Sequence, residues 1–126
     1  MFEITRLHHV SLIVSDTELA LGFYRDMLGL SVAQGRPNLA FPGAWLDLGS
    51  GQQLHLLELE NPDSATGRPE HGGRDRHTAF YVKSLNSLEE ILDKNNIAYT
   101  MSKSGRAALF CRDPDGNALE FIGQKP

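Results

Sequence analysis

The sequence has little of what marks several specialised classes of protein. Its 126 residues include a single cysteine, Cys111, so no internal disulfide can form. No apolar run approaches the roughly 20 residues of a membrane-spanning helix, and Met1–Arg6 has no signal-peptide core. Asp and Glu (16) outnumber Lys and Arg (12), which argues against a nucleic-acid-binding surface. We expect a cytoplasmic protein with no membrane or nucleic-acid partner.

What is present is typical of a globular protein. Hydrophobic residues make up 40% of the chain and charged residues 22%, which excludes a disordered chain. A chain of 126 residues is long enough to bury a core and fits one domain. We therefore predict a single domain over residues 1–126.

Two similar strand patterns indicate an internal repeat. His9–Val14 and His77–Val82 are rich in β-branched or aromatic residues, and each begins with His. A helical pattern follows each of them. The first begins after the N-cap candidate Asp16 and ends at Gly29. The second begins after Ser84, or three residues later at Ser87, and ends at the asparagines 95–96.

Three short strands are expected after each helix. They span residues 30–34, 44–48 and 53–59 in the first half, and 98–102, 107–111 and 118–122 in the second. The order β-α-β-β-β therefore occurs twice, which predicts an α+β fold. We place the first βαβββ module at about residues 5–60, a linker at about 61–75 and the second module at about 76–124.

The repeat places four candidate metal ligands at related positions. Without gaps, residues 51–56 align with residues 116–121, so His55 falls on Glu120, just as His9 falls on His77. Side chains alternate across a strand, and each helix must cover one face of its sheet. The opposite faces are then free to bring the four side chains together. Taken singly, each residue could equally be a surface or hydrogen-bonded group.

This set of donors suits a divalent first-row metal. His9, His77 and Glu120 would form a two-histidine, one-carboxylate site with open positions for substrate or water. His55 is a fourth ligand or a polar group that binds substrate. The pattern does not identify the metal, and Zn, Ni, Mn, Co and Fe(II) all remain candidates.

Other residues are candidates for binding substrate. Ser11 shares a strand face with His9, and Tyr81 shares one with His77. The Gly-rich and charged segment 67–76 directly precedes the His77 strand. It is either a flap whose arginines bind an anionic substrate or a solvated linker. The arginines of this segment are Arg68, Arg74 and Arg76.

The chain resembles the vicinal oxygen chelate superfamily. That superfamily includes glyoxalase I, extradiol dioxygenases, fosfomycin-resistance thiol transferases, methylmalonyl-CoA epimerase and bleomycin-resistance proteins. Three stretches carry the resemblance, which extends over nearly the whole chain. They are residues 7–30 with His9 and Asp16, residues 76–80 with His77, and residues 110–121 with Asp113-Pro114-Asp115-Gly116-Asn117 and Glu120.

The resemblance implies a fold and a ligand set. The fold would be two βαβββ modules that form a cupped mixed β-sheet around a metal. The ligands of the superfamily fall on His9, His77 and Glu120, and a further position that is Glu in many glyoxalases falls on His55. This departure leaves Glu120 as the one carboxylate that could act as a catalytic base. Homodimers are also implied, with sites at or near the interface.

The function expected from this resemblance is that of a glyoxalase-like metalloenzyme, a lyase or isomerase that acts on a small oxygen-rich metabolite. An extradiol-type ring-cleavage dioxygenase is the alternative within enzymes. A thiol transferase is disfavoured, because the chain ends soon after Glu120. A metal-free protein that sequesters a drug, as in bleomycin resistance, is the alternative from another class. It would not need the two histidines and the carboxylate.

Overall fold

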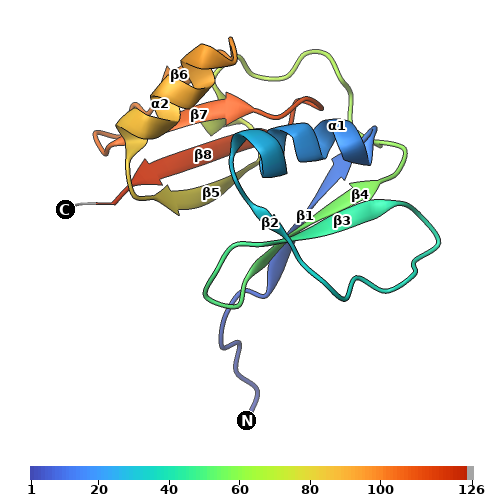
Figure 1. Ribbon diagram of the computed structural model, residues 1–126. Coiled ribbons are helices and arrows are strands. Elements are labelled where there is room, and N and C mark those ends of the chain that lie inside the picture. The colour runs from blue at the N-terminus through green and yellow to red at the C-terminus, as the bar shows by residue number, and fades with distance from the viewer. Residues whose placement is uncertain (125–126) are drawn as a thin grey trace. The chain divides into compact units, whose positions relative to one another are not determined.

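The computed structural model describes residues 1–124 and separates into two compact units, residues 1–61 and residues 62 onward. Each unit contains a four-stranded mixed sheet and a helix (Figure 1). The strand orders, β1-β4-β3-β2 and β5-β8-β7-β6, are equivalent. The twofold βαβββ arrangement predicted from the sequence is therefore confirmed.

The first unit begins with strand β1 (His9–Val14), which pairs in parallel with β4 (Gln53–Glu58). Strand β3 (Gly43–Asp47) is antiparallel to β4, and the short β2 (Ser31–Val32) completes the sheet. The core of this unit is formed by apolar residues of the strands and the helix. It contains Val14, Ala20, Phe23, Tyr24, Leu46, Leu54 and Leu56.

The helix of the first unit begins where the sequence predicts and then changes its hydrogen-bonding pattern. Helix α1 (Thr17–Leu21) follows Asp16, whose side chain accepts a hydrogen bond from the backbone N–H of Leu19 at 3.1 Å. It continues directly into a π-helical stretch, η1 (Gly22–Met27), which the apolar spacing did not indicate. Gly29 ends the helical segment in the left-handed conformation, with φ of +80°.

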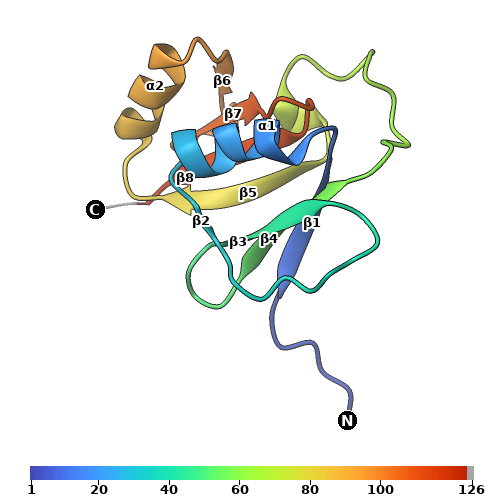
Figure 2. The ribbon, with the colours of Figure 1, turned by 45° about the vertical axis from the view of Figure 1, so that its right-hand side comes forward.

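The second unit repeats this plan. Strand β5 (His77–Val82) runs parallel to β8 (Ala118–Gly123), and β7 (Ala108–Arg112) and β6 (Tyr99–Met101) follow in antiparallel order. Helix α2 (Leu85–Lys94) begins after Ser84, which caps the N–H of Ser87, so the later start at Ser87 is wrong. Figure 2 shows α2 beside this sheet, and Leu88, Leu92, Leu109, Leu119 and Phe121 are buried.

The segment before β5 contains a short structured turn. A 3-10 helix, η2 (Gly72–Arg74), lies within the predicted linker and packs against β7 and β8. A Cβ atom added at Gly72 would lie 3.4 Å from the Cβ atoms of Phe110 and Ala118, so the backbone approaches this sheet closely. No helix within residues 1–124 has the length and hydropathy to cross a membrane.

Gly43 provides a test of the strand packing in the first unit. A Cβ at this position would lie 2.2 Å from the carbonyl oxygen of Leu56, which belongs to the paired strand and cannot move freely. We expect Gly43→Ala to lower the free energy of unfolding by about 1–3 kcal/mol. Gly22→Ala is the control, because its Cβ would meet nothing within 4 Å and its φ of −57° is helical. That change should be neutral or stabilise by roughly 0.5–1 kcal/mol. Equal effects of the two changes in urea denaturation would contradict the packing argument.

Candidate functional site

In the first unit, three aromatic rings stack on the sheet face that α1 leaves uncovered. The His55 ring lies parallel to the His9 ring, with centroids 3.9 Å apart, and to the Trp45 indole at 4.2 Å. The strand register explains this stack. Trp45 on β3 is paired with His55 on β4, and so is Ser11 on β1. His9 lies two residues before Ser11 and therefore shares its strand face. His55 is only 7% exposed. The structure thus brings the two candidate ligands His9 and His55 into contact.

A hydrogen-bonded chain fixes the tautomer of His55. Gln53 donates from Nε2 to Asp47 Oδ1 at 3.2 Å, which turns its carbonyl oxygen toward His55. That oxygen can only accept, so His55 donates from Nε2 at 2.9 Å. Burial, and secondly the neighbouring His9, lower the pKa of His55 below its ordinary value of 6.5. His55 is therefore a neutral imidazole at pH 7, with its lone pair on Nδ1.

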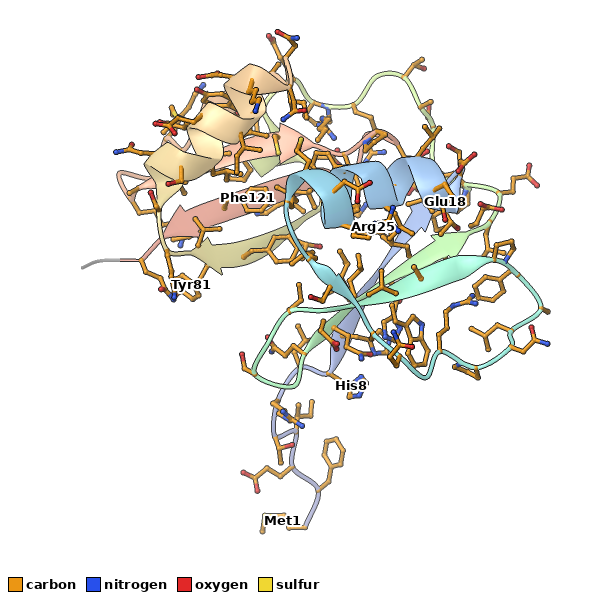
Figure 3. All side chains as sticks on the ribbon, in the orientation of Figure 1. Met1, His8, Glu18, Arg25, Tyr81 and Phe121 are labelled. Atoms are coloured by element: carbon orange, nitrogen blue, oxygen red, sulfur yellow. The ribbon has the colours of Figure 1, made fainter. Side chains whose placement is uncertain are left out.

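His8 is a neighbour of this stack and does not belong to it. The Nδ1 atoms of His8 and His9 share a hydrogen bond of 2.8 Å, and the two rings meet edge to face. His8 is exposed at the beginning of β1, where Figure 3 labels it. Ser11, predicted to bind substrate, lies on the same strand face as His9 and is exposed.

In the second unit, His77 and Glu120 occupy the positions equivalent to His9 and His55. Nε2 of His77 lies 3.3 Å from Oε1 of Glu120. The Glu120 carboxylate is nearly completely buried, with 2% of its side chain exposed, and its Oε2 accepts a hydrogen bond from Nη2 of Arg106 at 3.1 Å. The predicted repeat register therefore holds within each unit: in both, the first and last strands bring their two candidate ligands together.

The orientation of the His77 ring is set by its other nitrogen. Nδ1 donates to the backbone carbonyl of Asp75 at 2.9 Å, so a neutral ring has its lone pair on Nε2, facing Glu120. The ring also meets Phe110 edge to face, with centroids 5.2 Å apart. A nitrogen lone pair and a carboxylate oxygen repel each other when they face at this distance. A cation bound by both atoms would replace this repulsion with attraction.

Asp75 is held in turn by two arginines. Its Oδ2 lies 2.8 Å from Nη2 of Arg68 and 2.8 Å from Nη1 of Arg112. These hydrogen bonds, that of Arg68 first, hold the pKa of Asp75 far below its ordinary value of 3.8. Arg112 also donates to the carbonyls of Gly116 and Pro69. The clamp thus ties the segment before β5 to β7 and places the carbonyl that orients His77.

The remaining candidates for substrate binding have different surroundings. Arg76 pairs with Asp63, and Arg74 lies exposed at the end of η2. Tyr81 projects from β5, an edge strand, and is 73% exposed (Figure 3). Arg68 is engaged with Asp75, as described above. Their predicted contact with substrate stays a prediction.

A pocket of about 330 Å³ opens beside this arrangement. It lies where the segment around Glu70 and Gly72 approaches β6 and β7, and Phe110 and Arg112 contribute to its wall. Cys111 also lines it, but burial raises the pKa of this thiol to about 12, so the thiol is inert at neutral pH. The volume is at the lower end of the range for small-molecule pockets.

Sequence reasoning overlooked the residues that orient the candidate ligands. Gln53, Asp47 and Asp75 carry no motif, and their roles follow from hydrogen bonds across strands or to a backbone carbonyl. The contact of Arg106 with Glu120 was likewise not predicted. The separation of 14 residues across a strand and a turn gave no signal for it. Within each unit, the described side chains form no group of three or more His, Cys, Asp or Glu that could hold a metal.

The comparisons with known proteins agree with this architecture. The model of the Glyoxalase/Bleomycin resistance protein/Dioxygenase superfamily matches residues 6–121, and the chain belongs to this superfamily. It is 30% identical to Glyoxylase I 4 of Arabidopsis thaliana over 94% of this chain and 70% of the relative. It is 27% identical to lactoylglutathione lyase of Haemophilus influenzae over 93% of this chain and 91% of the relative.

A solved structure shows the same fold at low identity. The fosfomycin resistance protein FosX of Listeria monocytogenes, in complex with Mn(II) and a dihydroxypropylphosphonic acid, superposes with a TM-score of 0.75. The identity is 15%, and the match covers 98% of this chain and 95% of the other. At this identity the likeness establishes the fold alone.

The clamp around Asp75 can be tested by removing its charge. Asp75→Asn weakens two charge-assisted hydrogen bonds, and we expect it to lower the free energy of unfolding by roughly 1.5–3 kcal/mol. Asp26→Asn is the matched control, because Asp26 forms an exposed pair with Arg25, and we expect it to lower the free energy of unfolding much less than Asp75→Asn does. Nitrogen NMR of the His77 ring should show Nδ1 protonated in the wild type and a weaker preference in Asp75→Asn. An unchanged ring signal together with equal stability losses would contradict the clamp.

Proposed function

We propose that the protein is a metal-dependent, glyoxalase-like enzyme of the lyase or isomerase type that acts on a small oxygen-rich metabolite. Its proposed ligands for a divalent ion, Zn, Ni, Mn, Co or Fe(II), are His9, His55, His77 and Glu120. The observation that carries the proposal is the facing pair in the second unit, where Nε2 of His77 and Oε1 of the buried Glu120 carboxylate lie 3.3 Å apart.

The donor set fits such an ion. Two donor atoms that each lie about 2.1 Å from one ion, at an angle of about 90–110°, are separated by roughly 3.0–3.4 Å. The separation of Nε2 of His77 and Oε1 of Glu120 falls in this range. His55 has its lone pair on Nδ1, because Nε2 donates to Gln53. Neutral imidazoles with a second nitrogen already hydrogen-bonded are typical metal ligands.

The four side chains have unequal roles in the proposed reaction. A bound divalent ion would polarise the oxygens of the substrate. His9, His55 and His77 would each contribute a ring nitrogen to that ion. Glu120 is the one carboxylate of the set, and it moves a proton at the substrate carbon next to the polarised oxygen. Its burial strengthens its interactions with substrate charge, because little water competes for the carboxylate.

The relatives favour this chemistry over ring cleavage. Curated relatives that the chain matches over more than 90% of its length are named Glyoxylase I 4 and lactoylglutathione lyase. We therefore expect the metal-loaded protein to isomerise the adduct of a small α-ketoaldehyde with a thiol. Oxygen uptake with a catechol by the iron-loaded protein, without isomerase activity, would instead support a dioxygenase.

Metal binding tests the ligand assignment. Calorimetry with Mn(II), Ni(II) and Zn(II) should give one ion per pair of modules for the wild type. We expect His77→Ala and Glu120→Gln to weaken binding by at least about 100-fold, since each removes a ligand. His71→Ala is the control, because His71 also contacts Phe110 in the second unit but is not a proposed ligand. A wild type that binds none of the tested metals, Fe(II) and Co(II) included, would overturn the proposal.

Mixing two inactive variants tests whether one site draws its modules from two chains of a homodimer. His9→Ala damages the first module and Glu120→Gln the second. If each site joins modules of different chains, a mixed dimer contains one intact site, and mixing should restore up to about a quarter of the wild-type activity. If each site lies within one chain, mixing restores nothing. Size-exclusion chromatography with light scattering checks that dimers form and exchange subunits.

A further inference from the structure

Arg106 is a cation in direct contact with the proposed catalytic base. It precedes β7, and its Nη2 lies 3.1 Å from Oε2 of Glu120, while Oε1 of the same carboxylate faces His77. One oxygen of Glu120 thus faces the proposed ligand His77, and the other accepts a hydrogen bond from the Arg106 guanidinium. The burial of the two partners differs sharply, since 2% of the Glu120 side chain is exposed but 58% of the Arg106 side chain.

We propose that Arg106 selects substrates that carry an oxyanion group, a carboxylate or a phosphate-like group, next to the oxygens that reach the metal. This inference rests on the function proposed above. It adds a substrate class, small anionic metabolites, and names the residue that recognises it.

The charges of the site support this assignment. A divalent ion held by three neutral imidazoles and one carboxylate leaves the ligand set positively charged, and Arg106 adds a further positive charge beside it. A neutral substrate would leave these charges uncompensated at a partly buried position, whereas an anionic group offsets them. The same attraction raises the rate at which anionic molecules reach the site.

The geometry of the guanidinium leaves room for a second partner. A guanidinium presents five N–H donors, and one of those of Arg106 is directed at Glu120. The side chain is mostly exposed, so its outer edge can approach a carboxylate or phosphate in the two-pronged manner typical of arginine. Glu120 would hold the buried edge of the guanidinium, and the anion would bind to its exposed edge.

A purely structural role predicts a different behaviour. If Arg106 only neutralised the buried Glu120 carboxylate, its loss would change stability and metal affinity but would not distinguish charged from uncharged ligands. Two measurements therefore distinguish the roles: the affinity of the protein for the metal alone, and the affinity of the metal-loaded protein for an anion.

The experiment uses Mn(II) as the metal, oxalate as the anionic probe and dihydroxyacetone as the uncharged probe. Calorimetry measures Mn(II) binding first, and competition at the Mn(II)-loaded protein then measures each probe. Arg106→Gln removes the charge and keeps a polar amide, and Arg106→Lys keeps the charge without the fork. Lys103→Gln removes a second exposed cation of the same loop and is the matched control. Circular dichroism checks that each variant folds. If Arg106→Gln does not fold, Arg106→Lys is used for the comparison with the wild type.

We expect Arg106→Gln to bind Mn(II) as tightly as the wild type or up to about tenfold more tightly, because a repelling charge is gone. Its affinity for oxalate should fall by about tenfold or more, Arg106→Lys should lose less, and Lys103→Gln should stay within about threefold of the wild type. Dihydroxyacetone should be unaffected throughout. Oxalate affinity that is unchanged in Arg106→Gln, or lost equally in Lys103→Gln, overturns the inference and leaves the proposed function standing. A wild type without Mn(II) binding that also takes up none of the other candidate metals overturns the proposed function itself.

Discussion

The arrangement of the second unit depends on the cost of burying the Glu120 carboxylate. A charge that is removed from water must be paired and hydrogen-bonded, or it is lost as a charge. Here the compensation at Oε2 comes from Arg106, while Oε1 faces Nε2 of His77 and is the oxygen proposed to bind the metal. The His77 ring is in turn oriented by the carbonyl of Asp75, which the Arg68–Asp75–Arg112 clamp holds in place. A reactive group and the elements that support it are therefore one connected structure.

In the first unit, the buried side chain at the equivalent position is uncharged. His55 stands where its counterpart is a carboxylate, and it is enclosed between the rings of His9 and Trp45. A neutral imidazole pays a much smaller cost for burial than a carboxylate, and the chain through Gln53 to Asp47 satisfies its N–H. The two modules are thus alike in register and different in chemistry, because the position of His55 in the first is occupied by the carboxylate of Glu120 in the second.

Much of the fold could be predicted because its signals are local. The caps at Asp16 and Ser84 bond to N–H groups three residues away, and both helices begin where those residues predict. The strands His9–Val14 and His77–Val82 have the predicted bounds. Strand lengths that depend on a partner were predicted less well. The segment 30–34 keeps only Ser31–Val32 as strand, because those are the residues that pair with β3. The π-helical turn after Leu21 also had no sequence signal.

For the candidate site, the sequence by itself determined which residue types stand at the four related positions and that each pair shares a sheet face, because the alternation of side chains and the repeat fix both. Tertiary structure decided how those groups are used. It stacked His55 between two rings, set the lone pairs of His55 and His77, and placed Arg106 against Glu120. Such contacts join residues that are far apart along the chain, and their distances depend on how whole strands and loops pack, which no local spacing encodes.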